Sequence, residues 1–274
     1  MCAIPCVYYF SSNAVSISKL GKGPGPVVHT HFPASSRHFP SIALNPHSPQ
    51  APAFRRLNAF GRAKPDQPTL GRILPIVDTV DWVERLTKTP GITDIQLRIK
   101  DETDPDRIIE RVQMCQNICR DANIRLWIND YWEAAIKAGC FGVHVGQEDL
   151  VKCINEGGLD EMIKHNLALG VSTHSYGELA AALGVNPSYI SLGPVFGTSS
   201  KNLAFDSQGL SIVAKWRQLI PSDVPLVTIG GIGDSKTARQ NKEAGADCVA
   251  VIGAVTQSED VATAVRQLNA AMSE

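Results

Sequence analysis

Charged and amide side chains gather in one short segment of the chain, at the end of an apolar run. The segment is Gln96-Leu97-Arg98-Ile99-Lys100, and strand alternation would place Gln96, Arg98 and Lys100 on one face. Two neighbouring cations inside a protein need an anionic partner. A diphosphate can supply it, because arginine binds phosphate as a bidentate fork and lysine as a point charge. The alternative is an ion pair with one of the protein's own carboxylates.

Two aspartates follow the next two apolar runs. Asp130 comes after Arg125–Ile128, and Asp149 comes after Gly142–Val145. Two carboxylates beside a phosphate suit Mg²⁺, which binds few protein oxygens and takes others from phosphate. Either aspartate alone is better explained as the cap of a helix that begins at the next residue. The pair beside the basic segment favours a metal site.

Hydroxyl groups follow the fifth and sixth apolar runs. Ser172 follows Ala168–Val171 and could donate to a phosphate or leaving-group oxygen. The loop after Tyr189–Leu192 carries three hydroxyls and a lysine, namely Thr198, Ser199, Ser200 and Lys201. This loop suits an anionic ligand, and a flexible surface loop is the alternative.

Glycines follow the seventh and eighth apolar runs, as Gly230-Gly231 and Gly253. In barrel enzymes, backbone N–H groups at these places cradle a monophosphate. The residues therefore indicate two anionic ligands, a diphosphate near Arg98 and a monophosphate near the glycines. No nucleophile–base pair of the hydrolase kind accompanies them. The chemistry indicated is ionisation of a diphosphate, with the protein and a metal stabilising the leaving group.

Three histidines lie in or near these elements. His174 has no carboxylate beside it in the sequence to orient it as a base, so we expect a packed, hydrogen-bonded residue. His144 lies within an apolar run and His165 within a helical stretch. We expect structural roles for both.

Eight short apolar runs alternate with amphipathic stretches from Gly71 onward. The predicted strands are Ile73–Val77, Thr93–Leu97, Arg125–Ile128, Gly142–Val145, Ala168–Val171, Tyr189–Leu192, Leu226–Ile229 and Cys248–Ile252. The predicted helices are Asp81–Lys88, Pro105–Ala122, Tyr131–Ala138, Leu150–Lys164, Tyr176–Leu183, Leu210–Leu219, Ser235–Glu243 and Glu259–Ala271. This alternation indicates an α/β fold, and eight units favour a single (β/α)8 TIM barrel over an open doubly wound sheet. Active sites of such barrels lie at the carboxyl ends of the strands, where the candidate residues fall.

The first 65 residues differ from the rest in composition. They hold seven of the 26 Lys and Arg residues, nine of the 17 prolines and no acidic residue. Such a segment cannot bury enough apolar surface to offset the entropy of ordering. We predict a disordered, basic Pro/Ser/Gly-rich extension over residues 1–70 and the barrel over 71–274. The extension overlaps an organellar transit peptide in composition, but we expect a cytoplasmic protein.

Charge and cysteine content exclude several classes of protein. The 274 residues carry a net charge of −1, so no global basic field points to nucleic acid. No apolar run reaches the ~18 residues of a membrane span. The seven cysteines are odd in number and form no CxxC pair, so the sequence indicates neither a disulfide scaffold nor a zinc ribbon. Cys115 and Cys119, four apart in a helical stretch, are predicted to face the core.

Taken together, these segments resemble the thiamine phosphate synthase family. The matching pieces occur in family order: Gln96-Leu97-Arg98-Ile99-Lys100, Ile128-Asn129-Asp130, Val143 to Asp149, Leu169 to His174, Leu192 to Phe196 and on to Lys201, and Ile229 to Ile232. They cover about residues 71–270, and their combination is specific although each piece alone is not.

The resemblance implies a transferase of thiamine biosynthesis that joins hydroxymethylpyrimidine diphosphate to hydroxyethylthiazole phosphate. In this family the pyrimidine diphosphate loses pyrophosphate, and the thiazole nitrogen captures the methylene cation. The resemblance implies catalytic roles for Ser172, Lys201 and Arg98, and Mg²⁺ as cofactor at Asp130 and Asp149. By the same resemblance, the pyrimidine diphosphate is bound by Gln96, Arg98, Lys100, Asn129, Ser172 and Lys201. The thiazole phosphate is held by Thr198, Ser199, Ser200, Gly231, Ile252 and Gly253.

Two positions depart from the family pattern. Ser200 stands where the family usually has threonine, and a small effect is expected from the lost methyl group. Gly253 stands where many members have serine, so one side-chain donor is missing and weaker binding of thiazole phosphate is expected.

Three alternatives stay open. A thiazole tautomerase shares the fold but lacks much of the diphosphate and metal apparatus. A non-catalytic barrel that binds thiazole phosphate would not need Asp130 and Asp149. The basic N-terminal segment could instead be an interaction arm on a scaffold. The expected partners are small-molecule substrates, without nucleic acid or membrane, and a homo-oligomer is left open.

Overall fold

The computed structural model describes residues 69–197 and 207–273 of the chain. Most of the predicted N-terminal extension lies outside these described residues. The same holds for the loop residues Thr198, Ser199, Ser200 and Lys201.

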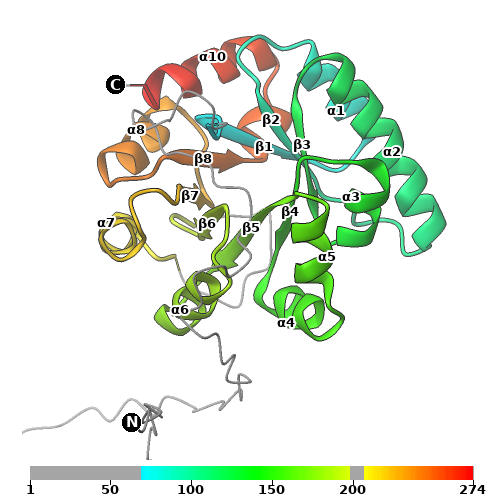
Figure 1. Cartoon of the computed structure of the whole chain (residues 1–274). Helices are drawn as coiled ribbons and strands as arrows, with labels where there is room; N and C mark the ends of the chain where they lie inside the picture. Colours follow the sequence, from blue (N-terminus) through cyan, green and yellow to red (C-terminus); the bar gives the residue numbers. More distant parts are fainter. Residues whose placement is uncertain (1–68, 198–206, 274) are drawn as a thin grey trace, which may run out of the picture. The chain divides into compact units, whose positions relative to one another are not determined.

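Eight parallel strands close into a barrel, and the helices lie around its outside (Figure 1). The strands are β1 (Ile73–Val77), β2 (Asp94–Leu97), β3 (Arg125–Asn129), β4 (Gly142–Val145), β5 (Ala168–Thr173), β6 (Tyr189–Leu192), β7 (Leu226–Ile229) and β8 (Cys248–Val251). Each strand pairs with its sequence neighbours, and β8 pairs with β1. The predicted (β/α)8 barrel is confirmed.

The helices fill the connections between successive strands. They are α1 (Val80–Thr87), α2 (Pro105–Asp121), α3 (Trp132–Ala138), α4 (Gln147–Asn155), α5 (Gly158–Lys164), α6 (Tyr176–Gly184), α7 (Leu210–Leu219), α8 (Ser235–Glu243), α9 (Gly253–Thr256) and α10 (Val261–Ala271). Within the described ranges, each helix is too short or too polar to span a lipid bilayer.

Two helix predictions need correction. The single helix predicted over Leu150–Lys164 is wrong, because α4 and α5 are separate and Gly157 between them has φ +73, a left-handed conformation that glycine adopts without strain. The one-turn helix α9 was not predicted, since four residues are too few to show a helical period.

Alternation along the strands divides the apolar side chains into two layers. Tyr189 packs inside the barrel with Trp127 and Val227, whereas Ile190 and Leu192 pack outward against the helices. Polar inward side chains near the carboxyl ends include Gln96, Asn129 and Ser172, and Trp127, Tyr189 and Val227 belong to an apolar inner cluster. The inner layer therefore forms the floor of any site at the top of the barrel.

The core-facing prediction for the cysteines of α2 is confirmed. Cys115 and Cys119 are both fully buried. Burial raises the pKa of each thiol to about 12, so both stay protonated and unreactive at neutral pH.

A buried carboxylate closes the amino-terminal end of the barrel. Asp94 is 0% exposed and accepts from Arg125 Nε at 2.8 Å, Trp127 Nε1 at 3.0 Å and the Gly71 backbone N–H at 2.9 Å. A second bond joins Arg125 Nη2 to Asp94 at 2.5 Å. A buried charge of this kind is tolerated only when it is paired and fully hydrogen-bonded, as here. The cluster ties β2 and β3 to the start of β1.

Candidate active site

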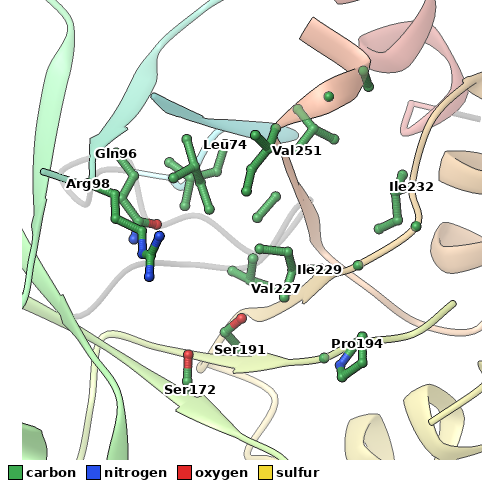
Figure 2. A pocket seen from close by; sticks show the side chains of 18 of the residues that line it. Leu74, Gln96, Arg98, Ser172, Ser191, Pro194, Val227, Ile229, Ile232 and Val251 are labelled. Carbon is green, nitrogen blue, oxygen red and sulfur yellow. The ribbon is translucent and has the colours of Figure 1, made fainter. Parts of the chain in front are cut away.

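A cavity of about 340 Å³ opens at the carboxyl ends of the strands, and all eight strands or the loops that follow them contribute to its wall. Figure 2 shows Gln96 and Arg98 side by side at one edge, and the apolar side chains of Leu74 and Val227 nearer the middle. Seven of the predicted substrate-binding residues line this cavity: Gln96, Arg98, Asn129, Ser172, Gly231, Ile252 and Gly253. They come from the ends of five strands, β2, β3, β5, β7 and β8, and the fold brings them together at one cavity.

Gln96, Asn129 and Asp130 form a hydrogen-bonded line across β2 and β3. Gln96 Nε2 donates to Asn129 Oδ1 at 2.9 Å, and Asn129 Nδ2 donates to the Asp130 carboxylate. Gln96 is only 2% exposed, so its amide has a fixed position. Each amide carries both donor and acceptor groups, which suits a polar heterocyclic ligand.

Arg98 and Lys100 have different surroundings. Arg98 lines the cavity, and no carboxylate in the described part of the chain forms an ion pair with it. Lys100 is not among the lining residues, and its Nζ lies 3.9 Å from Asp78 Oδ2. Both partners are about half exposed, so this pair is weak. β2 ends at Leu97, and strict alternation therefore does not extend to Lys100.

Asp130 and Asp149 follow adjacent strands, and neither caps a helix. The N-caps of α3 and α4 are Tyr131 and Gly146, without a capping side-chain hydrogen bond. The helix-cap explanation is therefore wrong for both aspartates. Asp130 has φ +67, which aspartate adopts more readily than most residues, and its backbone N–H donates to His144 O at 2.9 Å. This bond ties the ends of β3 and β4 together.

Asp130, directly after β3, and Asp149, in the first turn of α4, carry carboxylates of the kind that bind Mg²⁺, although neither is among the residues that line the cavity. The described residues contain no group of three or more His, Cys, Asp or Glu side chains placed to hold a metal. Mg²⁺ does not need one, because it binds through one or two carboxylates and completes its shell with water and phosphate oxygens. Asp130 and Asp149 thus suit a metal that shares its coordination with a phosphorylated ligand.

Ser172 is hydrogen-bonded to a histidine for which we expected a structural role. His144 Nε2 lies 2.9 Å from Ser172 Oγ, and His144 Nδ1 lies 2.7 Å from the Tyr189 hydroxyl. All three residues line the cavity. Complete burial raises the pKa of Tyr189 well above its usual value, so the phenol keeps its proton.

His174 has a carboxylate partner that we did not expect from the sequence. Glu178, at the start of α6, accepts from the His174 backbone N–H at 2.7 Å and lies 2.9 Å from His174 Nδ1. The signal was present, because Ser175-x-x-Glu178 has the spacing of a capping box, whose acidic residue folds back over the helix start. His174 lines the cavity and is held in one orientation.

Glycine backbone forms another part of the cavity wall. Gly231 has φ +67, and a Cβ there would lie 2.5 Å from Phe196 Cβ and 2.6 Å from Gly197 O. No side chain fits at this position, because Phe196 and Gly197 occupy the space, and Gly231 lines the cavity with its backbone. Gly253 and Ala254 begin α9, so their N–H groups lack intrahelical acceptors. At the neighbouring start of α8, the side chain of the N-cap residue Asp234 accepts from the backbone N–H of Thr237.

Sequence reasoning missed the cavity positions of His144, Tyr189 and Ser191. Alternation along β6 could have shown that Tyr189 and Ser191 share the inward face. The contact of His144 with Ser172 needed the register of β4 against β5, which no local pattern reveals.

Comparisons with known proteins agree with this geometry. The family model for thiamine monophosphate synthase matches residues 73–255. A thiamine-phosphate synthase of Photorhabdus laumondii is 39% identical over 223 residues, which cover 81% of this chain and 93% of that protein. One of Rhizobium etli is 41% identical over 196 residues, covering 72% and 92%.

Two solved structures share the barrel fold of this chain. A thiamine phosphate pyrophosphorylase from Pyrococcus furiosus matches with a TM-score of 0.60 and 26% identity, covering 74% of this chain and 95% of that one. A 3-hexulose-6-phosphate synthase matches with a TM-score of 0.54 at 17% identity, which shows a shared fold alone.

Proposed function

The chain belongs to the thiamine monophosphate synthase family, and we propose that it joins hydroxymethylpyrimidine diphosphate to hydroxyethylthiazole phosphate by first ionising the diphosphate. Its products are thiamine phosphate and pyrophosphate, as expected of a thiamine-phosphate synthase. The observation that carries this proposal is that Gln96, Arg98 and Ser172 line one cavity together with the glycine backbone of Gly231 and Gly253.

The diphosphate is assigned to the side of the cavity near Arg98 and Ser172. Arg98 carries a charge without a protein partner among the described residues, and Ser172 offers a hydroxyl group. Lys100, which does not line the cavity and pairs weakly with Asp78, is assigned to the same diphosphate from the family pattern. Lys201, in the loop outside the described residues, is assigned to the same diphosphate from the family pattern.

Asp130 and Asp149 are proposed to hold Mg²⁺ beside this diphosphate. When bound, the metal would neutralise charge on the leaving pyrophosphate oxygens. Asp130 follows β3, Asp149 lies in the first turn of α4 after β4, and neither residue is the N-cap of a helix.

The bond changes proposed for the reaction balance without a protein base. The bond from the pyrimidine methylene carbon to the diphosphate oxygen breaks, and both electrons leave with the oxygen. Arg98 and Ser172 stabilise the charge that develops there. The lone pair of the thiazole nitrogen then forms the new C–N bond. Gln96 and Asn129 hold the pyrimidine ring, and apolar Leu74 and Val227 keep water from competing for the cation.

The thiazole phosphate is assigned to the glycine wall. Gly231 exposes its backbone, and Gly253 and Ala254 offer N–H groups without helical acceptors. Ile252 lines the cavity beside them. Thr198, Ser199 and Ser200, also outside the described residues, are assigned here from the family pattern.

A coupling assay on the purified full chain tests this function. Both substrates are mixed with and without Mg²⁺, and pyrophosphate and thiamine phosphate are measured together. We expect equal, Mg²⁺-dependent release of both products. Binding of thiazole phosphate without turnover would instead support a non-catalytic binding barrel.

Replacing Gly253 by serine is expected to tighten binding of thiazole phosphate. The added Cβ would lie 3.3 Å from Oε1 of Gln257, the flexible end of an exposed side chain, so space can be made. A hydroxyl donating to a phosphate should lower the KM for thiazole phosphate about tenfold with little change in kcat. Gly253→Ala is the matched control without the hydroxyl, and equal effects of the two variants would contradict the proposed donor.

Deleting residues 1–65 is expected to leave kcat within about twofold of the full chain. The deletion spares Thr69, whose carbonyl accepts from Arg125 Nη2 at 2.7 Å, and Leu70, which is buried inside the barrel. Steady-state kinetics of the two proteins make the comparison. A large loss of turnover would indicate that the N-terminal segment is an interaction arm.

We propose small-molecule substrates as partners and a cytoplasmic location for the full chain.

A further inference from the structure

The hydroxyl of Tyr189 lies at the start of a hydrogen-bonded chain that ends at Ser172. Its three members stand on three consecutive strands, β6, β4 and β5, at neighbouring levels of the barrel. His144 on β4 and Tyr189 on β6 are both in register with Gly170 on β5. A side chain at position 170 would overlap the Tyr189 phenol ring, so the glycine lets His144 and Tyr189 meet across β5.

The direction of the first hydrogen bond follows from burial. Tyr189 is fully buried, and its ring packs edge-on against Trp127 with centroids 5.0 Å apart. Among the described residues, its hydroxyl has His144 Nδ1 as hydrogen-bond partner, at 2.7 Å. If His144 donated from Nδ1, the phenolic O–H would be a buried donor without an acceptor, which native structures avoid. The phenol therefore donates, and Nδ1 accepts.

The second hydrogen bond follows from the first. A neutral imidazole that accepts at Nδ1 carries its proton on Nε2. Nε2 then donates to Ser172 Oγ, 2.9 Å away. Since Ser172 Oγ already accepts from the histidine, its own O–H is left to donate elsewhere. Ser172 lines the cavity, so a ligand there can receive that bond.

We propose that Tyr189 and His144 are positioning residues that turn the Ser172 hydroxyl into a one-way donor toward the leaving oxygen of the diphosphate. The expected effect on turnover rests on the proposed function. The direction of the two hydrogen bonds does not depend on it. Hydrogen bonds aligned in one direction strengthen one another. The arrangement also prevents Ser172 from donating to His144, which would turn its proton away from the substrate.

The first test is the tautomer of His144, measured by two-bond ¹H–¹⁵N correlation spectra of substrate-free protein labelled at histidine. We expect a single form with the proton on Nε2. A proton on Nδ1 would overturn the inference whether or not the protein has the proposed activity. Spectra of His144→Gln identify the His144 signals.

The second test is a kinetic cycle of Tyr189→Phe, Ser172→Ala and the double variant. Tyr189→Phe keeps the ring and its packing, and we expect kcat to fall about five- to tenfold with both KM values nearly unchanged. In the Ser172→Ala background the same change should have no further effect. Tyr176→Phe, which removes an exposed hydroxyl, is the matched control and should match wild type.

Equal losses from Tyr189→Phe in both backgrounds would overturn the inference, because the tyrosine would then act without Ser172. An increase in KM alone would also overturn it, since that result indicates a binding or structural role. Absence of coupling by the wild-type protein would refute the proposed function, and the tautomer measurement would still decide the direction of the chain.

Discussion

Replacing Asp130 by asparagine is expected to lower turnover about 100- to 1,000-fold at saturating substrates and Mg²⁺, with a melting temperature close to that of wild type. The change removes one charge from the proposed metal site and keeps the size of the side chain. Asparagine tolerates the left-handed conformation that Asp130 adopts at φ +67. It also keeps an oxygen that can accept from Asn129 Nδ2. Asp130→Ala should lose turnover as well, but alanine adds backbone strain of about 1–2 kcal/mol.

The loss should depend on Mg²⁺ in a specific way. Steady-state rates measured over a range of Mg²⁺ concentrations should show that the variant needs more metal for half-maximal turnover. Asp160→Asn, in the first turn of α5 and exposed, is a matched change of charge away from the cavity and should behave as wild type. Unchanged turnover with unchanged metal dependence in Asp130→Asn would refute the assignment.

Replacing Asp94 by alanine is expected to lower the free energy of unfolding by about 3–5 kcal/mol. The carboxylate is fully buried, and its removal leaves Arg125, Trp127 Nε1 and the Gly71 N–H without their acceptor. These groups lie at the opposite end of the barrel from the cavity. Kinetic constants of the protein that remains folded should therefore change little.

Urea denaturation of wild type and Asp94→Ala measures this effect. Glu84→Ala, which breaks the exposed i,i+4 pair with Lys88, is the control and should unfold at a urea concentration close to that of wild type. A decrease in the free energy of unfolding below about 1 kcal/mol for Asp94→Ala would contradict this expectation. It would show that the barrel relaxes around the missing carboxylate.

The barrel could be predicted because each strand is a short apolar run bounded by turn residues. Four of the predicted strands, such as Ile73–Val77 and Leu226–Ile229, have the observed bounds, and the others differ by one or two residues. Helix ends were harder, since Gly157 breaks an amphipathic stretch whose apolar pattern continues through α4 and α5. Local pattern does not show whether a glycine interrupts a helix or lies within it.

The site could be predicted in part, because a barrel places every strand end at the same rim. This geometry was enough to bring Gln96, Asn129 and Ser172 together. The barrel geometry was not enough to place Lys100, which lies beyond the end of β2. Strand alternation no longer determines there which way a side chain points. The partners of His144 and His174 depended on strand register and on the fold of a helix start. Both are set by three-dimensional packing.

The central claim is that the diphosphate ionises before the thiazole nitrogen attacks. The most direct test compares single-turnover rates of two forms of the pyrimidine diphosphate. One form carries hydrogen on the reacting methylene carbon and the other carries deuterium. Ionisation changes that carbon from tetrahedral to planar, so we expect the deuterated substrate to react clearly more slowly. The rate should also stop rising once thiazole phosphate saturates its site. Equal rates for the two substrates under conditions where chemistry limits turnover would contradict ionisation and indicate direct displacement by the thiazole.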